Sequence, residues 1–256
     1  MVSPSTGAPR HAAFFDVDRT LLRGSSMLAL ARPLRRAGLI STRVTLRALA
    51  RQLLFGARGM SDPALQSAVA SLSEVIRGVD AAAVRRVADR AMGALVLPRV
   101  YDEAFQLMEW HRQRGDLIFL VSASPHELID ALQRILDADG VVASDVEVKH
   151  GKYTGRILRL NHGDAKGAAV EEFAHAYNLD LTESYAYGDS LGDQAMLERV
   201  GHPVAVNPDS RLSALAEERG WPQRHFRHRH PRPLARDGRR RPSTPRRGPA
   251  ADRARH

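Results

Sequence analysis

The sequence predicts an α/β protein in which helices cover both faces of a parallel, doubly wound sheet, with a helical insert after the first strand. Three observations favour this class. Short apolar segments alternate with helix-like segments over residues 98–223, which is typical of parallel strands joined by covering helices. A further apolar run, His11-Ala-Ala-Phe-Phe-Asp16, has the character of a strand. Residues 21–97, between the two, are mostly helical by pattern.

The first element is the strand over residues 11–16. In the insert, Ser61-Asp-Pro63 and Asp80 each indicate a helix start, because a capping side chain or an early proline favours the first helical turn. The remaining segments alternate along the chain. They are helices over residues 100–114, 125–136, 165–177 and 194–200, strands over 117–121, 184–187 and 204–206, and a hairpin over 146–160.

The chain has 256 residues and a mass of 28.2 kDa, enough for one large domain or for a domain with an insert. We expect four zones, which are a leader (1–10), a core (11–20 with 98–223), the helical insert (21–97) and a tail (224–256). The tail carries 12 Arg and 2 Asp, a net charge of +10 against +9 for the whole chain. Because it contains hardly any core-forming residue, we expect it to be disordered. The basic character belongs to the tail and indicates no specific nucleic-acid partner.

Cysteine is absent, which excludes disulfide scaffolds, cysteine-ligated zinc, iron–sulfur clusters and thiol nucleophiles. No apolar run approaches the roughly 18 residues of a membrane span, and the first ten residues lack the apolar segment of a secretory signal. We therefore expect a cytoplasmic protein without an integral membrane segment.

Residues 19–61 contain nine Arg and no Asp or Glu. Arg43, Arg47 and Arg51 recur at the spacing of one helical face. A solvated surface is the favoured interpretation, because arginine stems commonly cover apolar surface. Attraction of an anionic substrate, or weak contact with a membrane surface, is the alternative.

Polar residues follow the predicted strands where each strand ends. The first strand runs into Asp16-Val-Asp18-Arg19-Thr20, the second into Ser122, and a later one into Gly188-Asp189-Ser-Leu-Gly-Asp193. The carboxyl ends of parallel strands meet at one edge of the sheet, which is where ligands bind. Lys166, one of only three lysines in the chain, precedes the last of these strands at a helix start.

This set of side chains favours phosphoryl transfer. Carboxylate oxygens, without cysteine or histidine at metal spacing, favour Mg²⁺ as the metal. A carboxylate can attack phosphorus to form an aspartyl-phosphate, and a neighbouring carboxyl can act as general acid. A lysine and a serine can hold the phosphate oxygens while charge redistributes.

In order and spacing, Asp16-Val-Asp-Arg-Thr20, Ser122, Lys166 and Gly188-Asp-Ser-Leu-Gly-Asp193 resemble the four motifs of the haloacid dehalogenase (HAD) superfamily. The resemblance spans about residues 11–220 and implies a Rossmann-like HAD core. The helical insert resembles the C1 cap of subfamily IB, the group of the phosphoserine phosphatases, and the motif residues look closest to SerB-like hydrolases.

The resemblance implies a role for each motif residue. Asp16 would be the nucleophile and a Mg²⁺ ligand. Asp18 would be general acid and then general base, with its main-chain carbonyl on the metal. Lys166 would pair with Asp16 and the phosphoryl group. Asp189 would bind Mg²⁺, and Asp193 would hold the ion directly or through water.

Four further positions concern the substrate. By the same resemblance, Thr20 would orient the loop and Ser122 would bond a phosphate oxygen. Arg19 replaces a small residue, and it either meets the substrate in the cleft or faces solvent. Ser25 stands where phosphoserine phosphatases place a glutamate for the substrate's ammonium group, which argues against phosphoserine as the substrate. Ser124-Pro-His-Glu127 has the pattern of a capping box, which would place a helix N-terminus beside the phosphate.

The function that these observations favour is a Mg²⁺-dependent phosphomonoester hydrolase of the phosphoserine phosphatase type, with an aspartyl-phosphate intermediate and a small phosphorylated substrate. One alternative is a phosphotransferase with the same intermediate and another acceptor. The other is a non-catalytic, cationic binding or regulatory protein that uses the HAD scaffold and acts through its tail.

Overall fold

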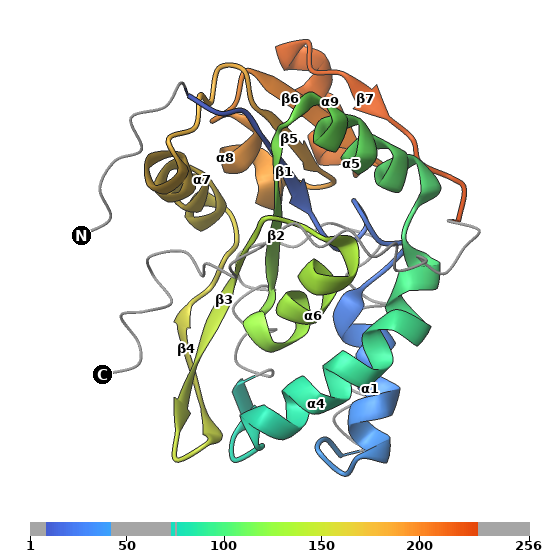
Figure 1. The fold of residues 1–256 in the computed structure, drawn as a ribbon, viewed down its shortest axis with the longest axis vertical. Coiled ribbons are helices and arrows are strands. Elements are labelled where there is room, and N and C mark those ends of the chain that lie inside the picture. Colours follow the sequence, from blue (N-terminus) through green and yellow to red (C-terminus); the bar gives the residue numbers. More distant parts are fainter. Residues whose placement is uncertain (1–8, 42–72, 75, 230–256) are drawn as a thin grey trace.

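The computed structural model describes residues 9–41, 73–74 and 76–229 (Figure 1). Within them the strands form one sheet of seven in the order β4-β3-β2-β1-β5-β6-β7. Neighbouring strands are parallel except β3 and β4, which are antiparallel. The strands are β1 (Ala12–Asp16), β2 (Leu117–Pro125), β3 (Gly140–Lys149), β4 (Lys152–Arg159), β5 (Tyr185–Gly188), β6 (His202–Val206) and β7 (Gln223–Arg224).

The central strand β1 is buried along its whole length, because helices cover both faces of the sheet. Its side chains alternate between two apolar clusters, with Ala13 and Phe15 in one and Ala12 and Phe14 in the other. The register sets Phe15 beside Leu120 of β2 and Tyr187 of β5. The carboxyl ends of these three strands therefore lie next to one another.

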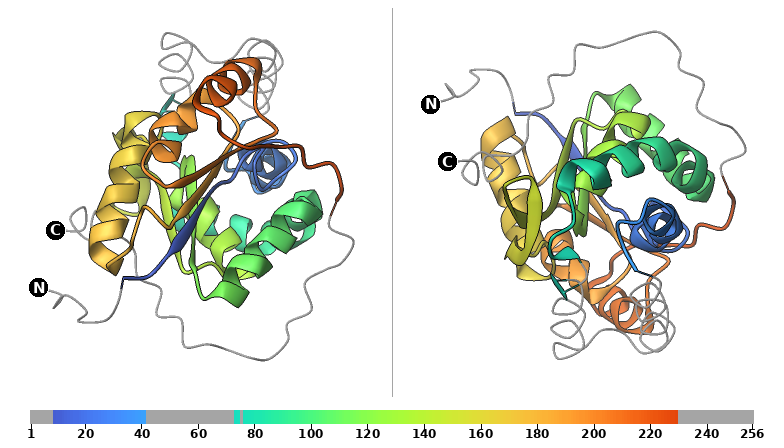
Figure 2. Two further views of the ribbon diagram at one scale, coloured as in Figure 1. Left: turned by 90° about the horizontal axis from the view of Figure 1, so that it is seen from above. Right: turned by 90° about the horizontal axis from the view of Figure 1, so that it is seen from below.

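Helices α5 and α6 contribute to the cluster of Phe15, and α7, α8 and α9 to the cluster of Phe14. Figure 2 shows α5 and α7 on opposite sides of the strands. The helices of this layered core are α5 (Asp102–Arg114), α6 (His126–Leu136), α7 (Asp164–Tyr177), α8 (Gln194–Leu197) and α9 (Ser210–Arg219), with the short 3₁₀ turn η3 (Leu191–Asp193) before α8.

The segment after β1 is mostly helical where the structure describes it. It contains α1 (Ser26–Arg36), α4 (Ala81–Ala91), the π-helical turn η1 (Met92–Val96) and the 3₁₀ turn η2 (Leu97–Arg99). The side chain of Asp80 caps α4 by accepting a hydrogen bond from the Ala83 N–H, which confirms the predicted helix start. Figure 1 shows α1 and α4 beyond the carboxyl end of β1.

The division into a core and an inserted cap stays a prediction. The helix start expected at Ser61-Asp-Pro63 and the arginines at positions 43, 47 and 51 lie outside the described residues. In the part of the chain that is described, no helix combines the length and the apolar character needed to cross a membrane.

The structure confirms the sheet and the predicted core helices, with shifts at their ends, and adds elements that the pattern did not indicate. Strand β3 begins at Gly140 as a parallel partner of β2, six residues before the predicted hairpin. A Cβ at Gly140 would lie 2.9 Å from the ring of Phe119, so only glycine lets the strand approach. The short strand β7 and the helix α9, which begins after the capping residue Asp209, were also missed.

The expectation that the chain is disordered from residue 224 is wrong for residues 224–229. Arg224 pairs with β6, and Phe226 is buried in the cluster of Phe15. The Glu103 carboxylate, in the first turn of α5, accepts hydrogen bonds from the main-chain N–H groups of Arg227 and His228. One buried aromatic side chain and one carboxylate thus order a segment whose composition is otherwise typical of disorder. Residues 230–256 lie outside the described part of the chain.

The contact between Glu103 and the C-terminal segment should depend on pH. Burial raises the pKa of Glu103, but the hydrogen bonds from Arg227 and His228 outweigh burial and lower it to about 2. A folded pKa below the ordinary value of 4.5 means that the ionised carboxylate stabilises the fold above about pH 4.5. This stabilisation is lost as the pH falls from about 4.5 toward 2.

We therefore expect Glu103→Gln to lower the free energy of unfolding by about 1–2 kcal/mol at pH 7, and by progressively less between pH 4.5 and pH 3. Urea denaturation at several pH values measures the difference. Glu109→Gln is the matched control, because Glu109 lies on the same helix and its ion-pair partner Arg112 is on that helix too. A deficit that does not change with pH would contradict the assignment.

Candidate active site

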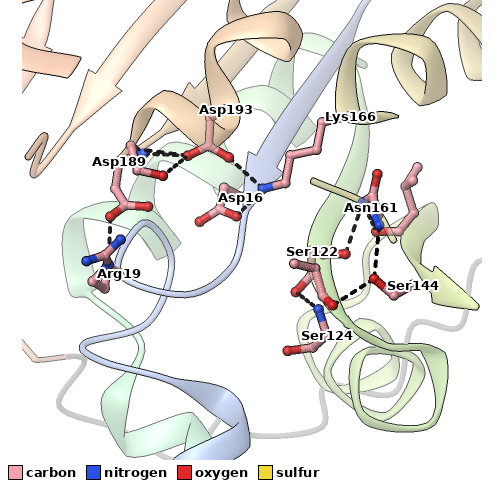
Figure 3. A network of polar contacts seen from close by, with 12 residues as sticks. Asp16, Arg19, Ser122, Ser124, Ser144, Asn161, Lys166, Asp189 and Asp193 are labelled. Atoms are coloured by element: carbon pink, nitrogen blue, oxygen red, sulfur yellow. Dashed lines mark hydrogen bonds and ion pairs between the residues drawn. The ribbon is translucent and has the colours of Figure 1, made fainter. Parts of the chain in front are cut away.

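Four charged side chains from three elements and the turn after β5 meet at the carboxyl end of β1 (Figure 3). Asp16 is the last residue of β1, Lys166 lies in the first turn of α7, Asp189 follows β5, and Asp193 ends η3. All four side chains are buried. The Lys166 ammonium donates to Oδ1 of Asp16 at 2.6 Å and to Oδ1 of Asp193 at 2.5 Å. The structure thus brings together the predicted nucleophile, the predicted lysine and two predicted metal ligands.

The arrangement fits a hard divalent cation. Asp16, Asp189 and Asp193 each offer one carboxylate oxygen, and these oxygens lie within 4.8 Å of one another. Oδ2 of Asp16 is buried and has no hydrogen-bond donor among the described residues. A buried, unpartnered carboxylate oxygen is unfavourable, and an oxygen-only ligand set is what Mg²⁺ binds. The chemistry of the donors therefore agrees with the predicted metal site.

The electrostatics of the cluster point the same way. Burial, followed by the charge of Asp193, raises the pKa of Asp16 to about 7. Burial and the charge of Asp16 raise the pKa of Asp189 to about 9. Burial alone would lower the pKa of Lys166, but the carboxylates of Asp16 and Asp193 raise it above its usual range, so the lysine stays charged. Negative charge exceeds positive charge here, and a bound cation would relieve the repulsion.

Asp193 is fixed at both of its oxygens. Oδ1 receives the Lys166 ammonium, and Oδ2 accepts hydrogen bonds from the main-chain N–H groups of Asp189 and Ser190. Gly188 makes room for it, since a Cβ there would lie 2.5 Å from the Asp193 Cβ. Asp193 therefore holds the turn after β5 against the lysine.

Asp18 lies beside this cluster and faces α1. Its Oδ1 accepts the Ser26 N–H at 2.8 Å, and the Ser25 hydroxyl lies 3.4 Å from its Oδ2. Burial raises the pKa of Asp18, although these hydrogen bonds oppose the shift. Ser25 also caps α1 by accepting the Leu28 N–H. Ser25, at the position where phosphoserine phosphatases place a glutamate, therefore carries a hydroxyl that orients Asp18.

The two remaining residues of the first loop have different environments. Thr20 is fully buried, and its hydroxyl has no hydrogen-bond partner among the described residues. Arg19 is exposed, as one of the two alternatives expects, and contact with a substrate stays a prediction. Its Nε donates to Oδ2 of Asp189 at 2.7 Å, so it forms an ion pair with a candidate metal ligand.

Ser122 lies in the last half of β2, one residue beyond the register partner of Asp16. Its hydroxyl oxygen accepts the Ser124 N–H at 3.1 Å. The capping box predicted at Ser124 is wrong, because β2 continues to Pro125, which precedes α6 without a side-chain cap. The Ser124 hydroxyl instead lies 3.3 Å from that of Ser26.

Sequence reasoning missed Asn161, which is fully buried behind Ser122. Its amide nitrogen donates to the main-chain carbonyls of Ser122 at 3.0 Å and Val142 at 3.1 Å. The main-chain N–H of Asn161 donates to the hydroxyl of Ser144, and that hydroxyl donates to the Ala123 carbonyl (Figure 3). These bonds hold the neighbouring strands β2 and β3 together beside Ser122. The one sequence feature that could have indicated Asn161 as part of the site is its position five residues before Lys166.

The family model described as haloacid dehalogenase-like hydrolase matches residues 13–198, which include all the residues of the cluster. The chain belongs to this family. This HAD-like hydrolase is 38% identical over 215 residues to the "Inhibition of morphological differentiation protein" of Streptomyces azureus, a match that covers 84% of this chain and 78% of the relative. It is 34% identical over 220 residues to "Phosphoserine phosphatase SerB1" of Mycobacterium tuberculosis, covering 84% and 71%.

Solved structures resemble the HAD-like hydrolase along most of its length. A protein of unknown function from Bordetella pertussis Tohama I has a TM-score of 0.70 and 27% identity, covering 84% of this chain and 98% of that chain. A phosphoserine phosphatase in apo form has a TM-score of 0.60 and 20% identity, covering 86% and 94%. These likenesses confirm the α/β fold.

Replacing Asn161 with alanine should destabilise the HAD-like hydrolase. The carbonyls of Ser122 and Val142 would both lose a buried donor, which costs about 1–3 kcal/mol of unfolding free energy. Chemical denaturation measures this loss. Gln194→Ala is the control, because the Gln194 side-chain amide bonds the side chain of Glu198, four residues on, and no main-chain carbonyl of a neighbouring strand. A loss no larger than that of the control would show that Asn161 is not structural.

Proposed function

We propose that this HAD-like hydrolase is a Mg²⁺-dependent phosphomonoester hydrolase that acts through an aspartyl-phosphate on Asp16. The observation that carries the proposal is the state of the Asp16 carboxylate. One oxygen is held by Lys166, while the other is buried without a hydrogen-bond donor among the described residues. A carboxylate oriented at one oxygen and unpartnered at the other can attack phosphorus.

Mg²⁺ would be held by Asp16, Asp189 and Asp193, together with the main-chain carbonyl of Asp18. When bound, it supplies positive charge that offsets the negative charge of the phosphoryl group and of the carboxylates. Lys166 supplies a second, fixed positive charge next to Asp16. It orients the nucleophile and stabilises the charge of the phosphoryl group as the bond to the leaving group breaks.

Asp18 is placed to move the proton. Its side chain is partly buried, and burial raises its pKa, which favours a protonated form that can act as an acid. As the Asp16 oxygen bonds to phosphorus, the bond from phosphorus to the ester oxygen breaks, and the Asp18 proton passes to that oxygen. Asp18 then takes a proton from water, which attacks the aspartyl-phosphate and releases inorganic phosphate and the free Asp16 carboxylate.

Ser122 and Thr20 complete the proposed phosphate site. The Ser122 oxygen already accepts the Ser124 N–H, so the hydroxyl proton is available to a phosphate oxygen. The bond from Asn161 to the Ser122 carbonyl keeps this hydroxyl in place. Thr20 orients the first loop, and residues 21–97 act as the cap that contacts the leaving group.

The substrate is a small phosphorylated molecule. A relative named as a phosphoserine phosphatase supports this class of substrate. The described surroundings of the site do not favour phosphoserine itself, because the Ser25 hydroxyl is engaged with Asp18 and with the first turn of α1. The first turn of α1 carries no acidic residue that could hold an ammonium group.

Asp16→Asn tests the nucleophile. The amide has the same shape but cannot form the aspartyl-phosphate, so we expect turnover of an aryl phosphate to fall by about a thousandfold or more with an unchanged circular dichroism spectrum. Asp164→Asn removes an exposed carboxylate two residues before Lys166 and should leave turnover unchanged.

The metal requirement has its own test. EDTA should abolish wild-type activity, and added Mg²⁺ should restore it. Turnover by Asp16→Asn would refute the mechanism, and activity in EDTA would refute the metal requirement.

Phosphoserine should not be the preferred substrate. We expect its kcat/KM to be matched or exceeded by other small phosphomonoesters, since no acidic group of the described residues near Ser25 is placed to hold its ammonium group. A screen of phosphorylated metabolites with Mg²⁺ measures this, with release of inorganic phosphate as the readout. A kcat/KM for phosphoserine well above all others would contradict this prediction while supporting the phosphatase proposal.

A further inference from the structure

Arg19, one of the two cations of the site, forms an ion pair with Asp189, a candidate metal ligand. Arg19 Nε donates to Oδ2 of Asp189 at 2.7 Å, and the Asp189 side chain is only 6% exposed (Figure 3). Asp189 is also one of the three residues whose carboxylate oxygens lie within 4.8 Å of one another. The same carboxylate therefore serves an internal guanidinium and belongs to the proposed Mg²⁺ site.

The backbone aims Arg19 at this partner. Arg19 has a φ of +71°, a left-handed conformation that costs energy for a residue with a side chain. Its N–H donates to the carbonyl of Leu22 at 2.8 Å. The loop after β6 holds both partners, because the Asn207 side chain donates to the Arg19 carbonyl at 3.4 Å and the Asp209 N–H donates to the Asp189 carbonyl at 2.9 Å. The ion pair is therefore formed by two anchored residues.

The two cations of the site differ in their freedom to move. The Lys166 side chain is 3% exposed and bonded to two buried carboxylates, so moving it would leave three charges unpaired. The Arg19 side chain is 51% exposed. Its guanidinium can rotate into water at little cost, because a half-exposed charge keeps most of its hydration. Arg19 is the cation that can leave.

We propose that Arg19 competes with the divalent ion for Asp189 and is displaced when the ion binds. The inference rests on the magnesium site of the proposed function. Without the ion, Arg19 neutralises the one carboxylate of the cluster that Lys166 does not bond. With the ion bound, two positive charges would meet at the Asp189 carboxylate, and the half-exposed Arg19 side chain would move away from it. Arg19 is thus a positioning residue that stabilises the metal-free site and lowers its affinity for the metal.

Removing the guanidinium should have opposite effects on the two states. We expect Arg19→Gln to lower the Tm without metal, because Asp189 loses its partner. The same change should raise the affinity for Mg²⁺ about three- to tenfold, the range expected for loss of one charge-assisted ion pair. Titration calorimetry and the Tm shift on adding Mg²⁺ measure this on the full chain without any substrate.

Arg23→Gln is the matched control. Arg23 is exposed, lies in the same loop and carries the same charge, but it forms no ion pair with a carboxylate among the described residues. Its loss should change the Mg²⁺ affinity less than about twofold, because an exposed charge at a distance is screened. An equal gain in Arg23→Gln would overturn the inference, since general charge rather than the ion pair would then be responsible.

A second measurement needs no loss of the side chain. The Nε–Hε signal of Arg19 in a ¹⁵N-labelled protein, identified by its loss in Arg19→Lys, should shift and exchange faster with water when Mg²⁺ is added. An unchanged signal at saturating Mg²⁺ would overturn the displacement. Equal Mg²⁺ binding by wild type and Arg19→Gln would overturn this inference alone, whereas no binding by either would overturn the magnesium site as well.

Discussion

The buried ammonium of Lys166 joins parts of the chain that are far apart in sequence. It bonds Asp16 at the end of β1 and Asp193 in the turn after β5, positions separated by 177 residues in the chain. A charge buried to this degree is unfavourable unless it is paired, and so is each carboxylate. Strands β1 and β5 are neighbours in the sheet, and α7 brings Lys166 to their carboxyl ends, so the three charges meet there. Moving β1, α7 or the turn after β5 would leave at least one charge unpaired.

The same cluster explains why the site favours a cation. Three carboxylates share two positive side chains, and only Lys166 is fixed by burial. Arg19, the second cation, is held by a strained backbone and by the loop after β6. That loop also contacts the C-terminal segment, because the side-chain oxygen Oδ1 of Asn207 accepts a hydrogen bond from the Phe226 N–H at 2.9 Å. Asn207 therefore connects the C-terminal segment to the loop after β1, which carries Arg19.

The prediction succeeded where the determining signal is local. Alternating apolar and amphipathic segments indicate strands and helices because each periodicity is set by a few neighbouring residues. The cap of α4 by Asp80 follows the same rule. The prediction failed where a long-range contact outweighed composition or pattern. Pairing with Ser144 extends β2 to Pro125 and removes the capping box, and burial of Phe226 orders a segment that is otherwise Arg-rich and polar.

The sequence by itself determined the class of the fold and which charged residues gather at one edge of the sheet, because strand ends in a parallel sheet converge and the motif carboxylates follow those ends. Only the tertiary structure decided how these residues are paired. Three of these pairings depend on distances between residues far apart in the chain. They are the ion pair of Arg19 with Asp189, the bond from Asn161 to the Ser122 carbonyl, and the bonds of the Glu103 carboxylate to the C-terminal segment. No local pattern encodes such distances, since they result from the packing of the whole sheet and its helices.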